Sequence, residues 1–119
     1  MRIAVPLDEG RLSQHFGHSK QFLLVDADLE QKQVLGKKVE TAPEHAPGVL
    51  PKWLAEHGVN VVIASGMGQH ARNLLVAGSV QVLTGVSVVD PEVLVTDFIN
   101  GKLETGANQC DHSGHGRSH

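Results

Sequence analysis

The sequence is poor in cysteine, in aromatic residues and in clustered positive charge. Its 119 residues include one cysteine, three phenylalanines, one tryptophan and no tyrosine. A single cysteine forms no internal disulfide, so we expect a reducing compartment. So few rings offer little on which single-stranded bases could stack. Ten Lys and Arg against thirteen Asp and Glu give a net charge of −3, and no basic block occurs. The composition therefore argues against a nucleic-acid-binding protein.

Long apolar runs are also absent. Residues 73–89 carry no charge, but Gly78 and Gly85 interrupt them, and a membrane-spanning helix needs roughly 20 mostly apolar residues. Near the N-terminus, Pro6 and then Asp8 come before any apolar signal region develops. We therefore expect no signal peptide, no membrane partner and a cytoplasmic location.

Enough apolar residues are present to build one core. They make up 40% of the chain and charged residues 19%, values typical of a folded domain rather than a disordered chain. From residue 106 onward the sequence loses all apolar periodicity. We expect one domain over residues 1–104 and a flexible Cys/His-rich tail over residues 105–119.

The first third of the chain has the pattern of antiparallel strands. Apolar runs occur at residues 3–5 and 22–25, and a more polar run follows at residues 34–39. Pro6 and the turn after it are expected to stop the first strand. The lysines of the third run are typical of the edge of a sheet.

The remainder alternates between helical and strand patterns. Expected helices and strands follow one another along the chain: helix 48–58, strand 59–64, helix 69–77, strand 80–84, and a helix from the capping residue Asp90 to Gly101. Strands that alternate with helices favour parallel pairs and right-handed crossovers. The expected fold class is therefore α/β, a three-layer α/β/α arrangement with a mixed five- to six-stranded sheet in the order β-β-β-α-β-α-β-α.

Metal-ligating side chains concentrate in the tail. One thiol and three imidazoles lie within its last ten residues: Cys110, His112, His115 and His119. Such a set suits zinc, copper, nickel or iron, so these residues are candidate metal ligands. The alternative is a solvated tail or a purification remnant.

A second group of histidines lies between the first two strands. His15, Phe16, Gly17 and His18 follow one another there, and Gly17 permits a backbone turn that places both imidazoles on one side. We regard these four residues as a candidate cofactor-binding loop, with His15 also a candidate metal ligand. The alternative is that both histidines are ordinary surface residues.

A glycine-rich turn forms the third candidate site. Gly66, Met67 and Gly68 follow an apolar strand and open a helix, with Ala71 completing a G-x-G-x-x-A pattern. Backbone N–H groups at a helix N-terminus bind anions, although too little chain follows for a dinucleotide-binding fold. Met67 offers a thioether or simply packs. We find neither a nucleophile elbow nor a pair of carboxylates placed for acid–base catalysis, so we do not expect an enzyme.

Three stretches carry a resemblance to a known family. They are residues 1–6, residues 13–19 with their His15-Phe16-Gly17 element, and residues 58–68. In these the chain resembles the dinitrogenase iron–molybdenum cofactor biosynthesis family of the NifX/NifB C-terminal type. The resemblance implies an RNase-H-like fold, no catalysis and non-covalent carriage of metal–sulfide clusters. Its orange-protein branch, which this chain matches in size, implies a molybdenum–copper sulfide cluster. His18 stands where that family usually has Arg.

The scarcity of thiols agrees with that implication. An ordinary iron–sulfur cluster uses about four thiolates, so a cluster carried by this chain must bring its own sulfides and is an anion. We expect a non-catalytic carrier or assembly factor for a cluster of molybdenum with iron or copper. The turn at residues 66–68 would cradle the cluster, His15 and His18 would hydrogen-bond or ligate it, and Cys110 would close the site.

Two other functions remain open. One is a binding protein for a single zinc, copper or nickel ion held by the tail and loop histidines. The other is a nucleotide-binding regulatory module that uses residues 66–71. For the carrier we expect cluster donor and acceptor proteins as partners, and a monomer or a weak homodimer.

Overall fold

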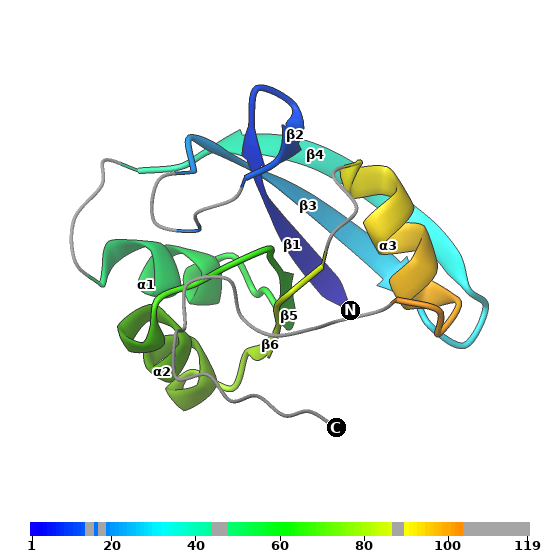
Figure 1. The fold of residues 1–119 in the computed structure, drawn as a ribbon. Coiled ribbons are helices and arrows are strands. Elements are labelled where there is room, and N and C mark those ends of the chain that lie inside the picture. Colours follow the sequence, from blue (N-terminus) through cyan, green and yellow to red (C-terminus); the bar gives the residue numbers. More distant parts are fainter. Residues whose placement is uncertain (14–15, 17–18, 44–47, 87–89, 104–119) are drawn as a thin grey trace.

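The computed structural model describes residues 1–13, 16, 19–43, 48–86 and 90–103 (Figure 1). Its strands and helices follow in the order β1 (Arg2–Asp8), β2 (Arg11–Leu12), β3 (Gln21–Asp28), β4 (Gln33–Thr41), α1 (Val49–Glu56), β5 (Val61–Ile63), α2 (Gln69–Ala77), β6 (Gln81–Leu83) and α3 (Pro91–Ile99). Across this described part, no helix has the length and apolar character needed to cross a membrane.

The strands form one mixed sheet. Its order is β4-β3-β1-β5-β6, and β2 adds to β1. The pairs of β1 with β2, of β1 with β3 and of β3 with β4 are antiparallel, whereas β1–β5 and β5–β6 are parallel. The expected hairpins in the first third and parallel pairs in the second are confirmed, and the lysine-rich strand β4 lies at the edge.

The helices cover the two faces of this sheet. On one face Leu50 and Leu54 of α1 and Leu75 of α2 pack with alternate residues of the strands. On the other face Leu94 and Val95 of α3 complete a second core cluster, so α3 lies opposite α1 and α2 (Figure 1). The expected three-layer α/β/α fold is confirmed, whereas its RNase-H-like classification stays a prediction.

The first strand runs past the proline that was expected to end it. β1 continues from Pro6 to Asp8, and the carbonyl oxygen of Pro6 accepts a hydrogen bond of 2.9 Å from the Ser13 backbone N–H. The N and C=O of one residue in a strand point to the same side. An N–H group at Pro6 would therefore face β2 and not β3. Its absence costs the β1–β3 ladder no hydrogen bond.

The short strand β2 was not expected from the sequence. Glu9 and Gly10 both have positive φ, 54° and 83°, and turn the chain so that Asp8 pairs with Arg11. With only two residues, β2 has no apolar pattern to reveal it. The element order thus contains one strand more than predicted.

The three helices begin and end close to their expected residues. α2 spans Gln69–Ala77 as predicted, and α3 starts with Pro91 after Asp90, whose side chain accepts a hydrogen bond of 2.9 Å from the Glu92 N–H. Gly101, with φ of 74°, follows the end of α3. The capping residues read from the sequence therefore set these boundaries.

Candidate functional site

The parallel strands bring three chain segments to one edge of the sheet. β1, β5 and β6 run in the same direction, so their carboxyl ends lie on the same side. After β5 the chain enters α2 on one face, and after β6 it reaches α3 on the opposite face. In α/β sheets such a change of face is the topological switch point, where ligands usually bind.

A hydrogen bond joins the histidine loop to the glycine-rich turn at this edge. The Phe16 backbone N–H donates to the carbonyl oxygen of Gly66 at 3.3 Å. The two sequence candidates are therefore adjacent at this point. The neighbouring residues His15, Gly17 and His18 lie outside the described residues.

The side chain of Phe16 anchors its loop in the core. It is only 2% exposed and packs edge-on against Phe22, with 5.7 Å between ring centroids. Phe22 in turn lies 5.5 Å from the ring of Trp53 on α1. Phe16 is thus a structural anchor, and its own backbone lies beside Gly66.

The turn before α2 leaves the helix N-terminus without a side-chain cap. Gly68 is the N-cap residue, its φ and ψ are −65° and 153°, and within the described residues no side-chain cap hydrogen bond is found there. No acidic residue occupies the first turn, and a Cβ built on Gly68 would meet no atom within 4 Å. Open N–H groups and the helix dipole together favour an anion.

Met67 lies beneath this turn. Its side chain is fully buried and belongs to the core cluster that contains Phe16 and Phe22. This placement favours the packing alternative for Met67 over a role as a soft ligand. Gly66 is also buried, so of the three residues Gly68 is the exposed one.

Arg72 was not singled out from the sequence but lies at the same edge. Its Nη2 donates to Oγ1 of Thr84, directly after β6, at 2.7 Å. It is the one Lys or Arg in residues 53–101, and this isolation was the signal that could have identified it. Arg72 lies one helical turn after Gly68, and its backbone N–H donates to the carbonyl oxygen of Gly68.

The predicted metal ligands cannot be placed. Cys110, His112, His115 and His119, like His15, lie outside the described residues. Within the ranges that the structure does describe, no three His, Cys, Asp or Glu side chains gather as a metal site.

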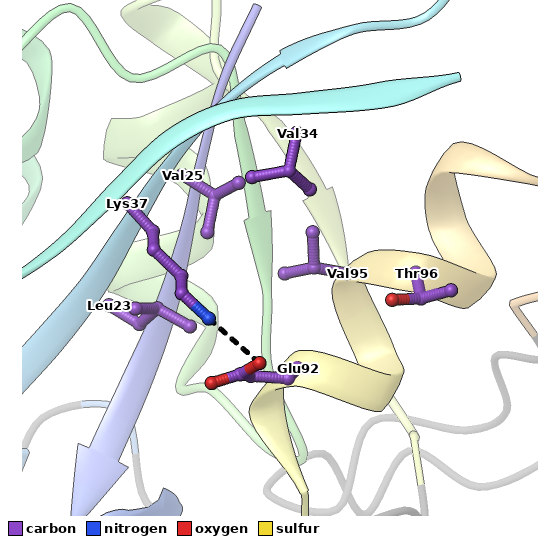
Figure 2. A pocket seen from close by; sticks show the side chains of 7 residues that line it. All are labelled: Leu23, Val25, Val34, Lys37, Glu92, Val95 and Thr96. Atoms are coloured by element: carbon purple, nitrogen blue, oxygen red, sulfur yellow. Dashed lines mark ion pairs between the residues drawn. The ribbon is translucent and has the colours of Figure 1, made fainter.

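A cavity of about 90 Å³ lies on the α3 side of the sheet (Figure 2). Its lining residues come from β3, β4 and α3: Leu23, Val25, Val34, Lys37, Glu92, Val95 and Thr96. Nζ of Lys37 lies 2.8 Å from Oε1 of Glu92, and both side chains are largely exposed. A mainly apolar lining with one neutralised ion pair is poorly suited to an anionic cluster.

Comparisons with known proteins agree with this fold. The uncharacterized protein MJ0580 of Methanocaldococcus jannaschii is 26% identical over 107 residues, which cover 87% of this chain and 90% of that protein. The crystal structure of PH0822 superposes with a TM-score of 0.81 at 30% identity, covering 88% of this chain and 94% of that one. The apo orange protein of Desulfovibrio gigas has the same fold, with a TM-score of 0.70, 23% identity and coverage of 90% and 93%.

The family comparison covers nearly all of the described chain. The model of the family described as "Dinitrogenase iron-molybdenum cofactor" matches residues 1–101. That range contains all nine strands and helices and both loops of the candidate site. The chain therefore belongs to the dinitrogenase iron–molybdenum cofactor family.

Proposed function

We propose that this protein is a non-catalytic carrier or assembly factor that binds a metal–sulfide cluster of molybdenum with iron or copper. The observation that carries the proposal is the hydrogen bond from Phe16 to Gly66, which brings Phe16 beside the turn that leads into the N-terminus of α2. Membership of the dinitrogenase iron–molybdenum cofactor family supports the same function.

The chemistry of the site suits a cluster that supplies its own sulfides. With one cysteine in the chain, the protein cannot provide the thiolates of an ordinary iron–sulfur centre. The first-turn N–H groups of α2 would donate to cluster sulfides, and His15 and His18 would add hydrogen bonds or a metal bond. Cys110, His112, His115 and His119 would be auxiliary soft ligands.

A site that makes few bonds to the metals of the cluster also suits a protein that passes the cluster on. A ligand held mainly by hydrogen bonds and charge leaves faster than one held by several thiolates, because no strong metal–sulfur bond must break. We therefore expect the cluster to arrive from one protein and to be delivered to another.

Isolation without oxygen tests this function. Protein purified anaerobically should contain molybdenum and inorganic sulfide, with iron or copper, and should show sulfide-to-metal charge-transfer absorption. Protein without cluster should take up tetrathiomolybdate, either alone or with Cu(I). A single bare metal ion, or a bound nucleotide with no sulfide, would contradict the proposal and support one of the alternative functions.

The His15→Ala variant tests the histidine loop. It should keep the thermal stability of the parent chain and hold tetrathiomolybdate less tightly, since one hydrogen-bond donor or metal ligand is lost. His57→Ala is the matched control, because His57 packs on Trp53 at the end of α1 with ring centroids 4.5 Å apart. Equal retention in both variants would remove His15 from the site.

A further inference from the structure

We propose that Arg72 is the cationic side chain that recognises the anionic cluster at the switch point. This inference rests on the proposed function and assigns the residue that offsets the charge of the cluster. No acidic partner competes for it: in the described part of the chain the carboxylates found in ion pairs are those of Asp26, Glu92 and Glu40, and their partners are Arg2, Lys37 and Lys38.

The guanidinium group is held in place but is not saturated. Nη2 donates to the Thr84 hydroxyl, which belongs to a residue only 5% exposed. Nε is buried and has no hydrogen-bond partner among the residues that the structure describes. A buried donor without an acceptor is costly, so a shift of the side chain that lets a ligand atom accept from Nε would gain free energy.

The position of Thr84 ties Arg72 to the proposed site. The register of β5 with β6 pairs Ile63 with Leu83, and the Ala64 N–H donates to the Leu83 carbonyl at 2.8 Å. One residue further, the Gly85 N–H donates to the Ser65 carbonyl at 3.0 Å. Thr84 therefore lies beside the segment that leads into Gly66.

Charge and topology favour the same class of ligand. Arg72 lies on α2 one turn after Gly68, and it donates to Thr84, the residue directly after β6. From there the chain continues to α3 on the other face of the sheet. A guanidinium group has several N–H donors in one plane and suits a multi-acceptor anion. The ligand that fits is a compact thiometallate or oxometallate anion rather than a bare cation.

A structural role alone is the competing explanation. In that case the bond from Arg72 to Thr84 would only fasten α2 to β6, and anions would not change the environment of the guanidinium group. Measurements on the Arg72 side chain itself separate the two roles, because a purely structural tie does not respond to a ligand.

The first experiment uses the full wild-type chain. The ¹⁵N and ¹H resonances of Arg72 Nε–H are followed by NMR during titration with tetrathiomolybdate and, separately, with molybdate. We expect a saturable shift of this resonance with tetrathiomolybdate. A saturable binding isotherm without any shift at Arg72 would overturn the inference and leave the proposed function standing.

The second experiment compares two variants that each remove one positive charge with a third that keeps it. Arg72→Met should weaken tetrathiomolybdate binding by about tenfold or more, the loss expected for one charge-assisted hydrogen bond, and should reduce its salt dependence. Arg72→Lys should recover part of the affinity. Lys102→Met removes the same charge from an exposed residue after α3 and should leave affinity within about twofold.

The outcomes distinguish the two proposals. If Arg72→Met is folded and binds as tightly as the parent, with the same salt dependence, Arg72 is not part of the site. If Arg72 responds to molybdate but the wild-type chain takes up no thiomolybdate or cluster, the anion site stands and the proposed cargo is wrong. If the wild-type chain binds neither anion, both proposals fail.

Discussion

Arg2 and Asp26 join the first strand to the third through two hydrogen bonds. Nε and Nη2 of Arg2 donate to the two carboxylate oxygens of Asp26 at 2.8 and 3.2 Å. Nη1 of the same arginine donates to the carbonyl oxygen of His57 at 2.6 Å. One side chain thereby connects β1, β3 and the end of α1, at the edge of the sheet opposite the candidate site.

This pair makes stability depend on pH in the acidic range. The hydrogen bond from Arg2 holds the pKa of Asp26 below its ordinary value of 3.8, so the folded state favours the carboxylate. The resulting stability is complete above the unfolded pKa and is lost as the pH falls through the lower folded pKa. Because both side chains are partly exposed, we expect a contribution of at most about 1 kcal/mol.

The Asp26→Asn variant checks that contribution. Urea unfolding at neutral pH should show the variant to be less stable than the parent. The difference should shrink as the pH is lowered below the folded pKa of Asp26, since the parent then loses the same charge. A difference that stays constant with pH would show that the carboxylate charge has no role.

Substitution of Gly68 tests the anion-binding turn. Gly68→Val should fold, because its φ of −65° suits any residue and its Cβ position is open. We expect a loss of about 1 kcal/mol, since Val is a poor N-cap residue, together with much weaker tetrathiomolybdate binding. Gly36→Val on β4 is the control, because a Cβ there also meets nothing within 4 Å. Equal binding by the two variants would contradict the proposed position of the anion.

Substitution of Phe16 tests the coupling between core and loop. Phe16→Leu should lower the free energy of unfolding by about 1–2 kcal/mol, because the ring contact with Phe22 is lost. Phe98→Leu, on α3, removes a partly buried ring that packs against the other core cluster and provides a control on the opposite face of the sheet. We expect weaker cluster retention only in the Phe16 variant, measured as the molybdenum remaining after gel filtration. Equal retention by both would show that the anchor does not act on the site.

Much of the fold could be predicted because local signals set it. Asp90 with Pro91 defines the start of α3, and the β-branched run at residues 61–63 identifies a fully buried strand. Pro6 was misleading, since a missing N–H stops a strand only where a neighbouring strand needs that donor. Whether a neighbour needs it depends on the direction in which the residue faces, which no local pattern reveals.

The candidate site was predictable only in part for a similar reason. Gly66 and Gly68 form a recognisable motif, but the contact of Phe16 with Gly66 and that of Arg72 with Thr84 depend on the order of strands in the sheet. The absence of any other Lys or Arg in residues 53–101 draws attention to Arg72 but assigns it no contact. Only the arrangement of β5 and β6 gives Arg72 a possible function.

Removal of the tail tests the predicted domain boundary. A chain that ends at Glu104 should keep the thermal stability of the full chain, because both core clusters of the described part are built from residues 1–103. If it fails to fold, the predicted boundary is wrong.

Cys110→Ser in the full chain should weaken loading with thiomolybdate and Cu(I), since a soft thiolate is lost. Unchanged loading and delivery by both variants would show that the tail has no part in cluster handling.

The exposed edge strand β4 has a consequence for the behaviour of the protein at high concentration. All but one of its residues are exposed, including Val34, Leu35 and Val39, and such edges recruit strands from other molecules. Lys37 and Lys38 lie in the middle of the strand, each paired with a carboxylate, and a docking strand would have to accommodate these charged side chains. Salt screens such exposed charges. Concentrated samples should therefore be least prone to aggregation at low ionic strength, with sheet-to-sheet association rising as salt is added.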